Sequence, residues 1–250
     1  MTDFSLAIVT PSHYGNFCAE YVIGIFDLQE HCRNQGIQTQ LLLTTGISVI
    51  DHVRNLLVNR FLWKTKMTHM LFVDDDMGFN VEDLAHMFEW RDYDVIGVMS
   101  PKKAFDWKRV KDIVLANPDI DPKILPHLAG DYVEMFELAD TSRMTVARQP
   151  IRVHSIGAGM MMISRRCLME LIEKAKPALI PAASGHPVDY PIYEFFRTSH
   201  LDGKPVGEDF YFCSLVNRHG GAIYGCPWIP VTHVGKYAWI GDLPGIARYT

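Results

Sequence analysis

Segments typical of strands and helices alternate through the first hundred residues, and this alternation constrains the fold more than any other feature. Apolar runs typical of buried strands cover residues 4–10, 37–46, 69–74 and 94–100. Segments with helical spacing separate them, over residues 18–36, 48–65 (an amphipathic pattern) and 81–90. Strands that are joined by helices pair in parallel through right-handed crossovers. The sequence therefore predicts an α/β fold, with residues 1–103 forming a parallel sheet of the kind that binds nucleotides.

The alternation decays after Lys102. We expect strands, antiparallel in part, over residues 131–139 and 145–164, and helices over residues 107–116, 165–175 and 207–221. Residues 176–207 are rich in proline, glycine and aromatic side chains and predict a long functional loop. No break in composition resembles a linker, so we expect one domain over residues 1–250, whose second half, 104–250, is mixed and partly antiparallel.

The net charge and the spacing of the cysteines argue against several classes of protein. A net charge of −5 does not favour a nucleic-acid or membrane-surface binder. The five cysteines are scattered and contain no C-x-x-C pair, which indicates reduced thiols rather than disulfides or a zinc site. Asp3 interrupts the start of the chain, and no run approaches the ~20 apolar residues of a membrane span. We expect a cytoplasmic protein without a transmembrane segment.

Three consecutive carboxylates, Asp74, Asp75 and Asp76, follow the third predicted strand in the stretch LFVDDDMGF. If the strand continued, Asp74 and Asp76 would share one face. The carboxyl ends of parallel strands are where α/β sheets bind ligands. Oxygen ligands suit Mg²⁺ or Mn²⁺, and these ions commonly bridge to substrate phosphates. The triplet therefore predicts a metal site, with a solvated aspartate-rich turn as the alternative.

Several motifs, taken in order, resemble the GT-A glycosyltransferases, particularly their family 2-like group. LFVDDDMGF resembles the D-x-D motif of that family, and AIVTPS stands where its first strand and nucleotide-contacting loop lie. DHVRNLLVNRFL resembles the helix that carries an arginine towards the nucleotide, and GAGMMMISRR the strand before the acceptor-side helix. GEDFYFC resembles the E-D motif, and THVG a late histidine that joins the metal in some members. The likeness covers nearly the whole chain, although residues 104–150 match poorly.

The resemblance assigns the metal and its ligands. It implies Mn²⁺ or Mg²⁺, with Asp76 as the first choice of direct ligand and Asp74 binding either the metal or the ribose. Asp75 could be the direct partner instead, because the family permits shifts within the triplet. His233 could supply a further ligand, and a purely structural histidine is the alternative.

The remaining site residues concern the donor and the acceptor. Donor contacts are expected from four residues, each of which could also be ordinary turn or solvated helix chemistry: Thr10, Pro11, Ser12 and Arg54. Asp209, at the start of a predicted helix, would be the base that takes a proton from the acceptor hydroxyl. Alternatively, its negative charge would only interact favourably with the positive end of the helix dipole. Lys102 and Lys103, after the fourth strand, could meet phosphate or the acceptor, but a solvated pair is the favoured expectation.

The resemblance implies metal-dependent transfer of a sugar from a nucleotide diphosphate sugar, by default a UDP-sugar, with inversion. The acceptor hydroxyl could belong to a glycan, a lipid-linked sugar, a protein or a modified nucleic-acid base. A haloacid-dehalogenase-like phosphatase also places D-x-D after an apolar strand, but Gly78 stands where that class usually has Thr or Val. A non-catalytic domain that binds nucleotide or glycan is the third possibility.

Overall fold

The predicted parallel strands form the centre of the molecule in the computed structural model, which describes residues 4–132, 148–183, 186–201 and 203–249. These strands are β1 (Ser5–Pro11), β2 (Gln38–Thr44), β3 (His69–Val73) and β5 (Val95–Val98). The intervening helices are α1 (Ala19–Asn34), α2 (Ile50–Lys64) and α3 (Val81–Ala85), which continues as the 3-10 helix η1 (His86–Trp90). The predicted alternation of the first half is confirmed.

Within the described residues the main sheet has seven strands, in the order β2-β1-β3-β7-β5-β12-β6. β1 is parallel to β2 and β3, and β12 (Ile223–Cys226) is parallel to β5. β7 (Met160–Ser164) is antiparallel to both β3 and β5, and β6 (Ile151–Val153) is antiparallel to β12. The expected α/β class with a mixed second half is confirmed. The strand expected over 131–139 lies largely outside the described residues.

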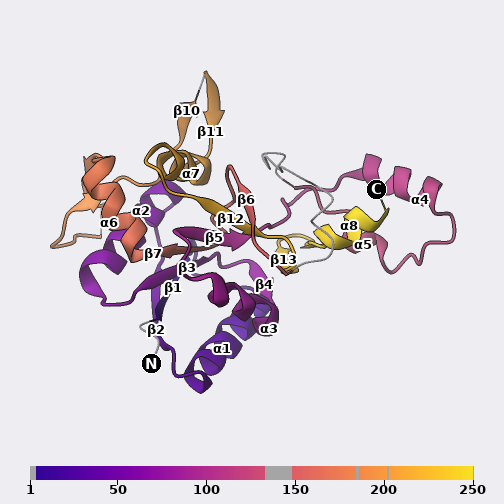
Figure 1. Cartoon of the computed structure of the whole chain (residues 1–250), viewed down its shortest axis with the longest axis horizontal. Helices are drawn as coiled ribbons and strands as arrows, with labels where there is room; N and C mark the ends of the chain where they lie inside the picture. Colours follow the sequence, from indigo (N-terminus) through magenta and orange to yellow (C-terminus); the bar gives the residue numbers. More distant parts are fainter. Residues whose placement is uncertain (1–3, 133–147, 184–185, 202, 250) are drawn as a thin grey trace.

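Helices cover both faces of this sheet (Figure 1). Alternate residues of each central strand enter two separate cores: Met161 and Ile163 pack beneath α2, α6 (Arg165–Lys174) and α7 (Glu208–Arg218). Met160 and Met162 pack against α1, α3 and η1 on the other face. This period of two is the geometry of a strand that is buried on both faces.

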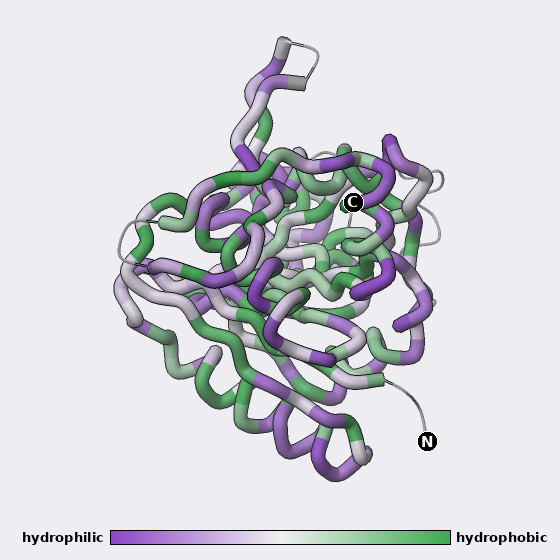
Figure 2. The backbone as a smooth tube through the Cα atoms, turned by 90° about the vertical axis from the view of Figure 1, so that its left-hand side faces the viewer, coloured by the Kyte–Doolittle hydropathy of each residue, from purple (hydrophilic) through white to green (hydrophobic). Residues whose placement is uncertain are grey.

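The long loop predicted over 176–207 is only partly a loop. It contains the strand pair β8 (Leu179–Ile180) and β9 (Ile192–Tyr193), and a hairpin of β10 (Ser199–Leu201) and β11 (Lys204–Val206). The hairpin stands out from the rest of the molecule in Figures 1 and 2. Each strand is two or three residues long, which is too short for a periodic sequence signal.

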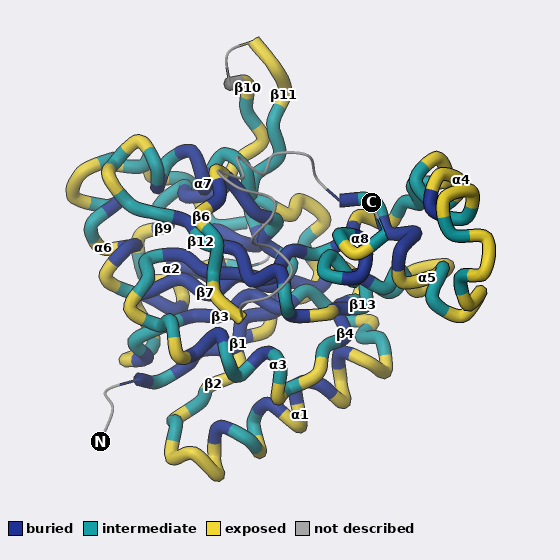
Figure 3. Tube along the Cα trace, turned by 45° about the vertical axis from the view of Figure 1, so that its right-hand side comes forward, coloured by how far each residue is buried: buried dark blue, intermediate teal, exposed yellow. Residues whose placement is uncertain are grey.

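A second small sheet, in the order β14-β13-β4, joins distant parts of the chain. It consists of β4 (Met77–Phe79), directly after the aspartates, β13 (Val231–Val234) and β14 (Ala238–Ile240). Beyond it, α4 (Trp107–Ala116), α5 (Leu125–Leu128) and α8 (Leu243–Tyr249) form a lobe around a separate small core (Figures 1 and 3). None of the helices in the described parts of the chain is both long and apolar enough to cross a membrane.

Candidate functional site

The three aspartates lie in the turn between β3 and β4. The expectation that the strand continues and sets Asp74 and Asp76 on one face is therefore wrong. The backbone N–H of Asp74 donates to the carbonyl of Gly159 at 2.9 Å, and the N–H of Met77 closes the turn on the carbonyl of Asp74 at 3.1 Å. A turn directs successive side chains apart, so each of the three carboxylates has its own partner.

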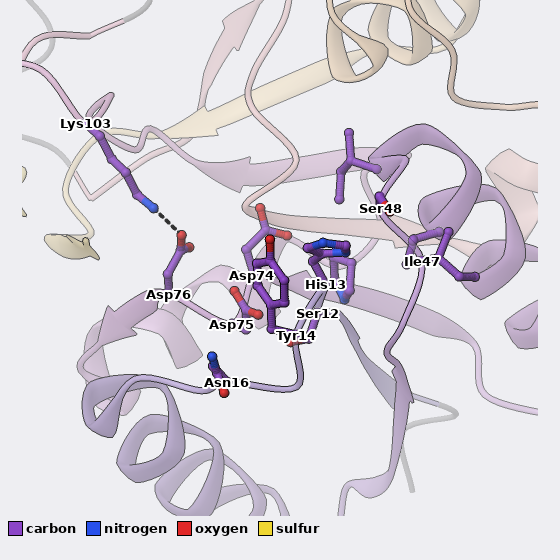
Figure 4. A pocket seen from close by; sticks show the side chains of 13 residues that line it. Ser12, His13, Tyr14, Asn16, Ile47, Ser48, Asp74, Asp75, Asp76 and Lys103 are labelled. Carbon is purple, nitrogen blue, oxygen red and sulfur yellow. Dashed lines mark hydrogen bonds and ion pairs between the residues drawn. The ribbon is translucent and has the colours of Figure 1, made fainter. Parts of the chain in front are cut away.

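A cavity of about 490 Å³ opens beside this turn (Figure 4). Its walls come from the end of β1, the segment before and at the start of α2, the aspartate turn and the loop after β5. The lining residues are Pro11, Ser12, His13, Tyr14, Asn16, Ile47, Ser48, Ile50, Val53, Asp74, Asp75, Asp76 and Lys103. All three aspartates of the triplet thus line one cavity, at the carboxyl end of β3, whereas the sequence analysis expected Asp75 to point away from the other two.

Arg54 of α2 holds the first aspartate. Its two terminal nitrogens donate to the two carboxylate oxygens of Asp74, each at 3.0 Å. Its Nε donates to Glu208 at 3.1 Å, and its side chain is only 5% exposed. Burial alone would lower the pKa of Arg54, but Asp74 and Glu208 outweigh it and raise that pKa. One buried guanidinium therefore connects the aspartate triplet to the first residue of α7.

Asp209, the next residue of α7, is a partly buried carboxyl. Burial raises its pKa to about 6, and the charge of Glu208 acts in the same direction. Two glycines leave room around the carboxylates: a Cβ at Gly157 would lie 3.7 Å from Asp209 Oδ2, and one at Gly159 would lie 3.5 Å from Asp74 Oδ2. The segment Gly157-Ala158-Gly159 therefore runs close to both carboxylates.

Asp75 faces the loop after β1. Burial raises its pKa, and a hydrogen bond from Ser12 opposes the shift. The backbone of the same residue anchors α1, because its carbonyl accepts from the N–H of Cys18 at 3.1 Å. Asp75 thus links the cavity to β1 and α1.

Asp76 lies between two cationic or potentially cationic groups. Its Oδ2 pairs with the ammonium of Lys103, and its Oδ1 lies 3.4 Å from His233 Nε2. Burial would raise the pKa of Asp76, but His233 and Lys103 outweigh it and hold the pKa below its ordinary value. The backbone pairing of β4 with β13 creates this contact, since it sets His233 opposite Met77, one residue after Asp76.

The groups around Asp76 could hold a divalent ion together with phosphate or water. Within the described residues no group of three or more His, Cys, Asp or Glu side chains is arranged to enclose a metal. However, Asp76 Oδ1 is buried without a hydrogen-bond partner. The Nδ1 of His233 lies 2.9 Å from the carbonyl of Pro101 and must donate to it, so a neutral ring turns the acceptor Nε2 towards Asp76. Mg²⁺ and Mn²⁺ commonly take one or two protein ligands plus phosphate and water, and these residues fit that requirement.

Only some of the other predicted site residues line the cavity. Pro11 and Ser12 line the cavity, whereas Thr10 is fully buried and its hydroxyl bonds to the hydroxyl of Tyr21 at 2.7 Å. Arg54 and Asp209 are not among the lining side chains, although Arg54 is bonded to Asp74, which is.

Sequence reasoning missed Tyr14, and for Lys103 it favoured a solvated side chain over a site contact. Lys103 is 39% exposed, yet it pairs with Asp76 and lines the cavity. Tyr14 is 80% exposed, yet it lines the cavity beside His13, with ring centroids 3.9 Å apart. An aromatic pair two residues after the first strand was the available signal.

The sequence matches no protein-family model and no curated protein. Solved structures that resemble the chain include A197 from STIV, with 13% identity, a TM-score of 0.49, and 93% of this chain and 86% of that chain covered. TarS from S. aureus (residues 1–349) has 11% identity and a TM-score of 0.43, covering 96% of this chain and 60% of that one. A Drosophila β-1,4-galactosyltransferase 7 mutant in complex with manganese, UDP-Gal and xylobiose has 7% identity and a TM-score of 0.39, covering 95% and 70%.

A galactosyltransferase is thus among the solved structures that resemble this chain. The TM-scores of all three structures lie below 0.5, and a likeness of this degree does not assign a function.

Proposed function

We propose that the protein is a metal-dependent glycosyltransferase that moves a sugar from a nucleotide diphosphate sugar, by default a UDP-sugar, to an acceptor hydroxyl with inversion. One observation carries this proposal. Two acidic motifs more than 130 residues apart, at Asp74–Asp76 and Glu208–Asp209, share the buried guanidinium of Arg54. Two acidic motifs joined through one guanidinium suit two separate tasks, cation binding and proton removal.

The donor would occupy the 490 Å³ cavity. Pro11 and Ser12 would contact the ribose or base, and the exposed ring of Tyr14 offers a stacking surface for the base. Asp76 and His233 would hold the divalent ion, with Asp74 or Asp75 as the further choice. When bound, the ion would neutralise the charge that builds on the departing diphosphate.

The chemistry requires a base on the acceptor side. The acceptor oxygen attacks the anomeric carbon, the bond from that carbon to the diphosphate oxygen breaks, and Asp209 accepts the hydroxyl proton. A carboxyl whose pKa burial raises to about 6 is a stronger base than an ordinary aspartate and is still ionised at neutral pH. Attack from the side opposite the leaving group inverts the anomeric centre.

The phosphatase alternative is less compatible with the contacts of Asp74. In that class the first aspartate of the motif is the nucleophile. Here both of its oxygens accept hydrogen bonds from Arg54, which draws electron density away from them. The site therefore favours a holding role for Asp74.

The direct test measures nucleotide binding and turnover together. We expect UDP to bind by calorimetry when Mn²⁺ is present and weakly in EDTA, and a panel of nucleotide diphosphate sugars to include one that is slowly hydrolysed without an acceptor. Asp76→Asn should lose the metal-dependent binding, and Tyr14→Ala should weaken it about tenfold. Asp189→Asn is the matched control, since Asp189 pairs with Lys64 and does not line the cavity.

Two outcomes would contradict the proposal. Release of phosphate from an aryl phosphate, without use of any nucleotide sugar, would identify a phosphatase. Metal-dependent nucleotide binding without turnover of any donor would identify a non-catalytic binding domain.

A further inference from the structure

Lys103 is held in place beside Asp76. Its ammonium pairs with Asp76 Oδ2, and Figure 4 shows the side chain pointing to that carboxylate. The turn after β13 confines its stem, because a Cβ at Gly235 would lie 3.4 Å from Lys103 Cδ. Among the described residues that line the cavity, Lys103 is the one lysine or arginine.

The other carboxylate oxygen of Asp76 lacks a hydrogen bond. Oδ1 is buried without a hydrogen-bond partner and faces His233 Nε2 at 3.4 Å. Because Nδ1 of His233 donates to Pro101, a neutral ring presents a lone pair to this oxygen. Two facing acceptors require a proton or a cation between them. When the His233 ring is neutral, the ammonium of Lys103 pairs with one oxygen of Asp76 and the other oxygen, Oδ1, has no donor.

We propose that Lys103 is a built-in counter-ion that competes with the divalent cation for Asp76 and, once displaced, binds the diphosphate of the donor. This inference rests on the proposed function. A divalent ion that contacts Asp76 takes over the charge that Lys103 neutralises. The freed ammonium, a compact charge with three donors, then needs an anion within the reach of its stem. The diphosphate would supply that anion in the same cavity.

The inference predicts coupling between the two ligands. The ion alone binds weakly, since it must displace a paired ammonium. Nucleotide diphosphate gives the ammonium a new partner and thereby strengthens ion binding, and the ion must strengthen nucleotide binding by the same factor. Lys103 would therefore favour loading of the ion together with the donor.

The experiment titrates Mn²⁺ into the full chain and follows the free ion by electron paramagnetic resonance, with and without UDP. Lys103→Met keeps the length of the side chain and removes the charge. We expect Mn²⁺ alone to bind this variant between about threefold and tenfold more tightly than the wild type. UDP at saturating Mn²⁺ should bind it more weakly by a similar factor. Lys103→Arg, which keeps the charge, should lie much closer to the wild type in both titrations.

Lys102→Met is the matched control. The side chain of Lys102 is 43% exposed, against 39% for Lys103, and it pairs with Asp131 instead of an aspartate of the triplet. Both affinities should stay at the wild-type values. Lys103→Gln provides a second neutral variant if the methionine variant does not fold.

Two results would overturn the inference. If the wild type binds Mn²⁺ and the neutral Lys103 variants bind it equally or more weakly, Lys103 does not compete for Asp76, while the proposed function stands. If neither the wild type nor these variants bind Mn²⁺ with or without UDP, both the inference and metal dependence are wrong.

Discussion

Asp209 is the residue whose environment departs most clearly from that of an ordinary aspartate. It lies at the start of α7, beside Glu208 and close to Gly157, and burial raises its pKa to about 6. A base acts only when it is ionised. We therefore expect the rate of transfer, measured at subsaturating substrate, to rise with pH with a midpoint near 6. Asp209→Asn should lower the rate by about 10²–10⁴-fold at pH 7.5 while UDP binding is retained.

The raised pKa of Asp209 also predicts how the free energy of unfolding depends on pH. In the unfolded chain Asp209 titrates near its ordinary value of 3.8, and in the folded protein near 6. The folded state therefore binds more protons between these values, so Asp209 lowers the free energy of unfolding as pH rises from about 4 to about 6. Asp209→Asn should be more stable than the wild type by about 1–3 kcal/mol at pH 8 and equally stable at pH 3.5, measured by urea unfolding. A variant less stable at pH 8 would contradict the charge-burial explanation.

At the residue scale the sequence predicted an acidic centre but not its internal contacts. The triplet stood out because three adjacent carboxylates after an apolar strand are unusual. For Lys103 solvation was favoured over a contact with phosphate or acceptor, because a lysine pair after a strand is normally solvated. Its contact with Asp76 joins the segment after β5 to the turn after β3, a long-range contact that no local pattern encodes. For Thr10 the sequence predicted a contact with the donor, but its hydroxyl bonds to the hydroxyl of Tyr21 instead.

Helix α2 is the element that organises the site. The sequence predicted an amphipathic helix, but most of its middle is buried, including the polar residues Arg54, Asn55 and Asn59. The prediction failed because these polar side chains face inward, where each finds backbone or carboxylate partners. Arg54 reaches Asp74 and Glu208, whereas the two asparagines reach the segment that was predicted to be a loop.

Removing the guanidinium tests the link between β3 and α7. Arg54→Met leaves Asp74 and Glu208 partly buried without their counter-charge, so we expect a loss of about 3 kcal/mol in the free energy of unfolding. Adding Glu208→Gln should recover part of this loss, since it removes one unpaired carboxylate. Arg60→Met is the control on the same helix, because Arg60 is exposed and contacts only the carbonyl of Leu43 among the hydrogen bonds of its described side chain. A loss equal to that of the control would show that the bridge does not stabilise the fold.

The side chain of Asn55 pairs with backbone groups of Phe195 and Phe196, as the backbone of a neighbouring strand would. Its amide donates to the carbonyl of Phe196 at 2.7 Å, and its side-chain oxygen accepts from the N–H groups of Phe195 and Phe196 at 2.8 and 2.9 Å. Asn55→Leu keeps the size and removes all three bonds, leaving buried backbone groups unpaired. We expect a loss of about 2–4 kcal/mol in chemical unfolding and faster protease cleavage between residues 176 and 201. Asn34→Leu, at the exposed end of α1, should change neither measurement.

At the scale of the whole molecule, strong helix–strand alternation made the first half predictable, and weak alternation left the second half undetermined. β7 comes from the second half and yet lies between β3 and β5 of the first half. An antiparallel strand inserted between distant parallel strands is a long-range choice, since its apolar sequence would suit several positions in the sheet. The partition at residue 103 and the single-domain organisation therefore stay predictions that the cooperativity of unfolding can test.

The lobe of α4, α5 and α8 offers that test. Among the described residues its core has four buried side chains, Ile113, Leu128, Tyr132 and Ile246, whereas the two main cores are far larger. The lobe joins the rest of the molecule through β14, which pairs with β13, the strand that carries His233. A small core opens at lower free energy than the central sheet. By hydrogen exchange we expect amides in α4 and α8 to exchange at least about a hundredfold faster than those of β1 and β3.

Binding of Mn²⁺ and UDP should also slow hydrogen exchange in the strands next to this lobe. Mn²⁺ with UDP binds the folded site, and linkage stabilises whatever must stay folded to form it. His233 and Lys103 lie on β13 and on the segment that follows β5, so amides in residues 231–240 and 102–103 should exchange more slowly with both ligands present. The outer edge strand β2, away from the aspartates, serves as the internal control and should change least. Equal exchange of α4 and β1 without ligands would mean that the chain opens as one cooperative unit. Protection of β2 without protection of β13 would mean that the ligands bind somewhere other than at Asp76.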